Sequence, residues 1–146
     1  HVDGMTIEEA EHMLATRLYQ NTAKVHFDQF AANDGRFKRR LIYGGHIVSL
    51  ARALSFNGLA NAFKVAAING GTHTNPTFSG NTIYAWSEVK ECMDIPGRDD
   101  VGALRLRTVA SKDRSSEGHP DKTDDGNYDE SVVLSFDYTV LMPRRV

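Results

Sequence analysis

The stretch RRLIYGGHIVSLARALSFNGLANAF, residues 39–63, decides the fold. After Gly44-Gly45, apolar and small residues recur at three- and four-residue spacing, which predicts a helix. Small side chains occupy much of the remaining surface of this helix, so we predict that it is mostly buried. The repeating positions are Ile47, Leu50, Ala51, Leu54, Gly58 and Leu59.

The glycine pair at the start of this helix indicates where chemistry would take place. Gly44 and Gly45 leave bare backbone N–H groups facing any molecule that docks there, and the helix dipole favours negative charge at that end. We therefore expect the start of the helix to be the active end.

Most of the sequence after the helix has the pattern of β-strands. Apolar and polar residues alternate over 82–93, 101–110 and 131–142, which predicts three strands with one buried face. Residues 65–68 form a shorter apolar strand, which the sequence Asn69-Gly70-Gly71 is expected to break or bend. The polar segment 111–130 is too long for a tight hairpin and is expected at the sheet edge. These elements predict an α+β fold in which an antiparallel sheet curls round one helix.

The N-terminal segment predicts shorter helices. Thr6 and Glu9 have the spacing of a capping box, which predicts a helix over 7–19. Asp28 is expected to begin a brief helix over 28–32, as its cap. The predicted core-facing side of the first helix holds Ala10, Met13, Leu14, Arg17 and Leu18.

Composition limits the classes of protein. A length of 146 residues suits one domain, and the formal charge of -2 gives no indication of nucleic acid or an anionic membrane as a partner. The single cysteine, Cys92, excludes an internal disulfide framework and fits a reducing compartment, so we expect a cytoplasmic protein. No set of His, Cys, Asp or Glu has metal-ligand spacing. The chain begins with His1 rather than Met, which suggests a piece of a longer polypeptide.

Three segments resemble, in the same order, motifs of the MaoC-like, R-specific enoyl-CoA hydratase branch of the hotdog fold. They are NTAKVHFD at 21–28, LIYGGH at 41–46 and PTFSGNT at 76–82. Longer stretches, such as HVDGMTIEEAEH at 1–12 and YAWSEV at 84–89, resemble a double-hotdog subfamily with substrates of the mesaconyl-CoA type. The resemblance implies that residues 1–146 form one hotdog domain. A second hotdog domain, in the same polypeptide or in a dimer, would be its partner.

The resemblance implies a hydratase/dehydratase acting on an α,β-unsaturated acyl-CoA without any cofactor, since coenzyme A is part of the substrate. Hydration needs a base for water, an acid for the α-carbon and donors for the enolate-like oxygen. His26 is the expected proton carrier, because imidazole moves protons in either direction near neutral pH. Gly44 and Gly45 would supply the donors. The alternative is steric, with glycine allowing the helix start to pass close to a strand.

Asn21 stands where the family has its second acid/base group, an Asp. An amide holds no proton at working pH, so Asn21 would orient water or substrate, or would only end a helix. Asp28 would orient His26 or cap the following helix, and Asp28 and His46 are the nearest candidates for the missing proton carrier. A free carboxylate on the substrate also needs a cation or a donor. The candidates for substrate binding, besides the glycine pair, are Tyr43, His46 and Arg40, with Arg39 as a neighbour.

Two other functions remain alternatives. An acyl-CoA thioesterase has the same fold but uses a carboxylate near the helix start, and residues 44–55 contain no Asp or Glu. A non-catalytic CoA-binding or structural hotdog half is consistent with Asn21, which removes one titrating group.

Overall fold

The computed structural model describes residues 1–145, which form one antiparallel sheet and several helices. The strand order is β1-β3-β4-β5-β2. None of the helices within the described residues is long and apolar enough to cross a membrane. The elements in chain order are β1 (Met5–Thr6), α1 (Glu9–Leu18), α2 (Lys24–Phe27), α3 (Gln29–Ala32), α4 (Gly44–Leu54), α5 (Phe56–Leu59), β2 (Lys64–His73), β3 (Thr82–Ile95), β4 (Arg98–Lys112) and β5 (Val132–Pro143).

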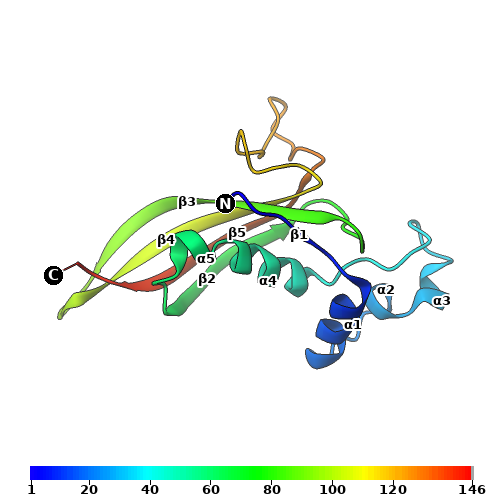
Figure 1. Ribbon diagram of the computed structural model, residues 1–146, viewed down its shortest axis with the longest axis horizontal. Helices are drawn as coiled ribbons and strands as arrows, with labels where there is room; N and C mark the ends of the chain where they lie inside the picture. Colours follow the sequence, from blue (N-terminus) through cyan, green and yellow to red (C-terminus); the bar gives the residue numbers. More distant parts are fainter. Residues whose placement is uncertain (146) are drawn as a thin grey trace.

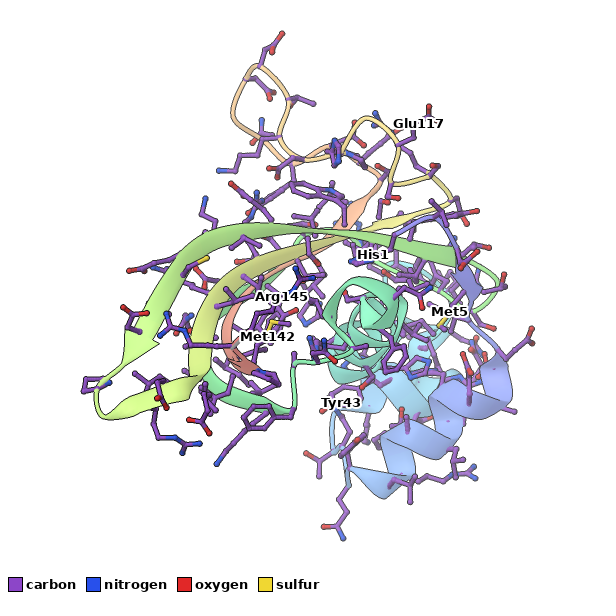
Figure 2. All side chains as sticks on the ribbon, turned by 60° about the vertical axis from the view of Figure 1, so that its left-hand side comes forward. His1, Met5, Tyr43, Glu117, Met142 and Arg145 are labelled. Atoms are coloured by element: carbon purple, nitrogen blue, oxygen red, sulfur yellow. The ribbon has the colours of Figure 1, made fainter. Side chains whose placement is uncertain are left out.

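The sheet curls round α4, which confirms the α+β arrangement expected for a hotdog fold. Figure 1 shows α4 lying against one face of the sheet, and Figure 2 shows the strands bending round its axis. The helix buries the predicted side, and each fully buried aliphatic side chain contributes roughly 1.5–3 kcal/mol. The core joins Ile47, Leu50, Ala51 and Leu54 of α4 to Ile83, Ala85, Leu106, Leu134, Tyr138 and Val140 of the sheet.

The long helical pattern is divided at Ser55. The hydroxyl of Ser55 donates to the carbonyl of Ala51 at 2.7 Å, and α4 ends there. The short helix α5 follows, with Leu59 partly buried against the same core. Residues 44–59 therefore form two helices rather than one, and Gly58 is exposed.

The predicted start and buried face of the first helix are both wrong. Thr6 belongs to β1, where its hydroxyl bonds to that of Thr82 at 2.8 Å, and Glu8 and Glu11 make the first-turn contact instead. The buried residues of α1 are His12 and Thr16, whereas Leu14 and Leu18 are 57% and 70% exposed. Four of the five residues on the predicted core face are therefore exposed, and Met13 is half-buried.

Residues 69–71 fit the second of the two expected outcomes, a bend rather than a break, and the expected place of the 111–130 segment needs correction. The Asn69-Gly70-Gly71 sequence does not end β2, which continues to His73 with register shifts between Val65 and Ala67 and between Ile68 and Gly70. The glycines bend the strand without breaking its pairing with β5. In addition, the 111–130 segment is not at a sheet edge, because β4 and β5 are adjacent inner strands.

The β4–β5 loop, residues 113–131, folds over the face of the sheet opposite α4 (Figure 1). Trp86 on β3 donates its Nε1–H to the carbonyl of Pro120 at 3.0 Å. Arg107 on β4 forms a bidentate pair with Asp121, with both distances at 2.6 Å. This loop thereby covers the outer face, and the opposite, concave face is left for α4 and the cavity beside it.

Candidate active site

A cavity of about 370 Å³ lies beside the start of α4. Its wall is largely apolar with a few polar groups, which is the usual composition of a small-molecule site. Segments far apart in the sequence line it together: α2, the start of α4, the end of β2 and the turn at residues 74–77. The lining residues are His26, Phe37, Leu41, Ile42, Gly44, Ile47, His73, Thr74, Asn75, Pro76 and Thr77.

His26 lies in this cavity and is held in one orientation. Its Nδ1 is 3.0 Å from the carbonyl oxygen of Leu41. A carbonyl only accepts, so Nδ1 carries the hydrogen and the neutral ring keeps a free lone pair on Nε2. The ring also makes an edge contact with Tyr43, with centroids 5.9 Å apart. The side chain is therefore prepared to exchange a proton through Nε2.

Gly44 and Gly45 make the close approaches that the steric alternative requires, and their role as donors to the substrate remains a prediction. A Cβ on Gly44 would lie 2.5 Å from Nε2 of His73, and a Cβ on Gly45 would lie 2.6 Å from the Tyr43 ring. Any larger residue at either position would thus displace an aromatic or imidazole ring. Within residues 1–145 the N–H groups of Gly44 and Gly45 also have no hydrogen-bond acceptor, while those of His46 and Ile47 pair with the Tyr43 carbonyl.

His12 on α1, which the sequence analysis did not identify, binds the N-cap residue of α4. The backbone N–H of Tyr43 donates to Nε2 of His12 at 3.0 Å, and His12 is fully buried. Burial lowers the pKa of His12 from 6.5 to about 4; His46, His26 and Arg40 act in the same direction, while Glu9 opposes it. The ring is therefore neutral near pH 7 and acts as an acceptor for the helix start.

The side chains of His46 and Arg40 are bound to acidic residues of α1. His46 is buried and its Nε2 lies 3.3 Å from the Glu11 carboxylate. Arg40 pairs with Glu9 and donates to the sulfur of Met13 at 2.9 Å. Neither side chain lines the cavity. Their assignment to substrate binding remains a prediction. In this structure the Nε2 of His46 is paired with Glu11, and the Arg40 guanidinium is paired with Glu9.

Asn21 and Asp28 also lie outside the cavity lining. The side-chain oxygen of Asn21 accepts from the backbone N–H of Ala23 at 2.9 Å, and the residue lines a separate hollow between α1 and α2. Asp28 caps α3 by accepting from the N–H of Ala31 at 3.0 Å. The capping reading of Asp28 is thus confirmed. A direct catalytic role of either residue remains a prediction.

His73 is the cavity residue that the sequence analysis missed. It ends β2, and its ring lies against Gly44 at the start of α4. Burial lowers the pKa of His73, and the charge of His26 lowers it further. Every residue of β2 is solvent-exposed to some degree, so no periodicity in this strand singled out His73.

A group of basic and aromatic side chains borders the cavity at Phe37. Arg36 lies over the Phe37 ring at 5.1 Å, and Arg39 lies over the Phe78 ring at 4.5 Å. The two rings pack edge to face at 5.5 Å. Arg39 also donates to the Ser79 carbonyl at 2.9 Å. We call Arg36, Phe37, Arg39 and Phe78 the cationic rim.

Among residues 1–145 no group of three or more His, Cys, Asp or Glu is arranged to hold a metal ion.

The chain is similar to known proteins in sequence and in structure. No protein-family model matches the chain. It is 69% identical to the β-methylmalyl-CoA dehydratase of Chloroflexus aurantiacus and 58% identical to the mesaconyl-CoA hydratase of Cereibacter sphaeroides, in each case over 99% of the chain. The chain spans only 41% and 40% of the lengths of these relatives.

Solved structures give the same fold. A MaoC domain protein from Chloroflexus aurantiacus superposes with a TM-score of 0.96 at 68% identity, over 100% of this chain and 42% of that protein. A double-hotdog protein from Mycobacterium tuberculosis has a TM-score of 0.67 at 22% identity, over 98% of this chain and 37% of that protein. These similarities confirm the hotdog fold and the resemblance to the MaoC-like hydratases and dehydratases.

Proposed function

We propose that this chain provides an active site for the reversible hydration of an α,β-unsaturated acyl-CoA of the mesaconyl-CoA and β-methylmalyl-CoA type. The observation that carries the proposal is that His26 and the unpaired amide of Gly44 meet at one cavity beside the start of α4. The identity to a dehydratase and a hydratase acting on such thioesters supports the choice of reaction.

The chemistry follows from the positions of these groups. The thioester oxygen would accept hydrogen bonds from the N–H groups of Gly44 and Gly45, which stabilise the enolate-like charge together with the dipole of α4. Such donors each contribute roughly 2.7–4 kcal/mol to lowering the barrier in sites of this kind. His26 would exchange a proton with the reacting part of the acyl group through Nε2. Its bond to Leu41 keeps that nitrogen, rather than Nδ1, available.

The cationic rim supports coenzyme A as the carrier of the acyl group. Arg36 and Arg39 place positive charge next to Phe37, which lines the cavity. The phosphates of coenzyme A would lie there, because guanidinium groups bind phosphate well. The adjacent turn supports a channel at the same place, since Pro76 and Thr77 line the cavity.

The proposal includes a second hotdog domain, in the same polypeptide or in a dimer, and no cofactor beyond the CoA of the substrate. The relatives are more than twice as long as the matched segment, which supports a larger assembly. Exposed apolar residues give such a domain a surface to cover, since Leu18 ends α1, Tyr19 follows it directly, and Ile68 is 70% exposed on β2. A cytoplasmic location completes the proposal, and the free, exposed thiol of Cys92 is consistent with reducing conditions.

The test is an assay of the full-length protein with mesaconyl-CoA and crotonyl-CoA. Hydration removes the enoyl absorbance, whereas release of free thiol would indicate a thioesterase and contradict the proposal. His26→Gln should lower kcat by roughly two to four orders of magnitude, the usual contribution of a general acid/base. The matched control is His119→Gln. His119 is an exposed residue of the β4–β5 loop, and its ring packs on Trp86 of β3. This control should keep wild-type activity.

A further inference from the structure

We propose that His73 is the second proton carrier of this site and works as a pair with His26. The inference rests on the proposed hydratase function and extends it, because the family motif has an Asp where this chain has Asn21. Adding water needs both a base and an acid, and one imidazole cannot act on two separated atoms at once.

The cavity itself narrows the choice of a second group. Of its described lining residues, His26 and His73 are the only two with an imidazole, and none is an Asp or Glu. The acidic residues nearest in sequence to Asn21 already have partners outside the cavity. Asp28 caps α3, while Glu9 and Glu11 pair with Arg40 and His46. The missing Asp is therefore not replaced by another carboxylate at the cavity wall.

The ring of His73 is placed where a proton carrier would be useful. It lies so close to Gly44 that even a methyl group there would meet Nε2 at 2.5 Å. The expected thioester oxygen binds at the same helix start, so the reacting carbons would be within reach of this ring. Among residues 1–145 the His73 ring makes no hydrogen bond, which leaves both of its nitrogens free.

The two rings are electrostatically coupled as a pair needs to be. Burial against the cavity wall lowers the pKa of His73, and a charge on His26 lowers it further. The neutral form of His73 is thus favoured whenever His26 holds a proton. The pair then offers one base and one acid at the same time.

In the hydration direction, neutral His73 takes a proton from water as the water oxygen bonds to the β-carbon. The electron pair of the double bond moves into the thioester, giving an enolate held by the N–H groups of Gly44 and Gly45. Protonated His26 then gives its proton to the α-carbon, and the thioester carbonyl re-forms. The net result is addition of one water molecule. A proton returned from His73 to His26, directly or through solvent, restores the pair.

The experiment compares His73→Gln, His73→Asn, His26→Gln and the His119→Gln control in the full-length protein. We expect both His73 variants to lose about 10²- to 10³-fold in kcat with KM changed by less than about threefold. The pH–rate profile should lose one of its two limbs. Binding of the saturated analogue butyryl-CoA, which needs no proton transfer, should match wild type and shows that each variant is folded.

Three results would overturn the assignment of His73. One is a kcat within about threefold of wild type in variants that bind butyryl-CoA. Another is an unchanged two-limbed pH profile. The third is a raised KM at unchanged kcat, which would make His73 a binding residue only. All three presuppose an active wild type; a wild-type protein that hydrates neither mesaconyl-CoA nor crotonyl-CoA would instead refute the proposed function.

Discussion

The buried His12 should make the stability of this protein depend on pH. Its pKa is 6.5 in a free side chain and about 4 in the folded protein, chiefly because of burial. As pH falls below 6.5 the unfolded chain binds a proton at this site before the folded chain does, so the free energy of unfolding decreases. The stabilising contribution is complete above pH 6.5 and is lost as pH falls towards 4.

The size of the effect follows from the two pKa values. Between about pH 7 and about pH 5 the loss integrates to about 2 kcal/mol, and below both pKa values it saturates near 3 kcal/mol. His12 is 0% exposed, so water does not screen the cost of charging its ring. Replacing it by Gln keeps an acceptor in place for the N–H of Tyr43 and removes the titrating group.

The measurement is urea unfolding of the full-length wild type, His12→Gln and His119→Gln at both pH values. Wild type and the His119 variant should lose the same amount of stability on acidification, while His12→Gln should lose about 2 kcal/mol less. His73 also has a lowered pKa but is present in all three proteins, so its contribution cancels. An identical pH slope in wild type and His12→Gln would refute the reasoning.

Three further changes test other parts of the structure. Gly45→Ala should lower kcat/KM at least about tenfold with little change in Tm, because its Cβ would meet the Tyr43 ring at 2.6 Å and displace it from His26. Arg36→Ala should raise KM for acyl-CoA about three- to tenfold at unchanged kcat, and it should not affect an acyl-pantetheine substrate that lacks the distal phosphates. Tyr138→Phe should cost about 1–3 kcal/mol in urea unfolding, because the buried hydroxyl accepts from Arg52 at 3.0 Å and bonds to a threonine hydroxyl at 3.1 Å.

The elements that could be predicted from the sequence are those with one buried and one exposed side. The spacing of Ile47, Leu50 and Leu54 identified α4 because the sheet covers that side of the helix. Strand β5 was predicted for the same reason, since Leu134, Phe136, Tyr138 and Val140 are buried and alternate with more exposed residues. In both elements local periodicity and tertiary burial agree.

Where local pattern and tertiary burial disagree, the prediction was wrong. In α1 the leucines form a helical stripe, yet the chain buries the polar pair His12 and Thr16 instead. Thr16 satisfies its hydroxyl locally by donating to the carbonyl of His12 at 2.8 Å, and His12 finds a distant backbone partner in Tyr43. Such partners come from tertiary contacts, which hydrophobic periodicity does not report.

The same limit applies to the site. His26 and Gly44 could be predicted because both lie in motifs that resemble those of a known family. His12 and His73 could not be predicted. His12 lies on α1 and accepts from the backbone of Tyr43, and His73 lies at the end of β2, far along the chain from His26. Their positions depend on the sheet closing round the helix, which brings distant segments to one cavity.

The β4–β5 loop offers a practical handle on this molecule. The loop lies on the side of the sheet away from α4 (Figure 1). In its tip Lys122 pairs with Tyr128, and Asp124 between them is exposed. With Cys92 changed to Ser, an Asp124→Cys variant would have one thiol within residues 1–146 for attaching a dye or for immobilisation on a sensor chip. The label would then sit apart from the cavity mouth, so acyl-CoA binding could be followed on tethered protein without blocking the entrance.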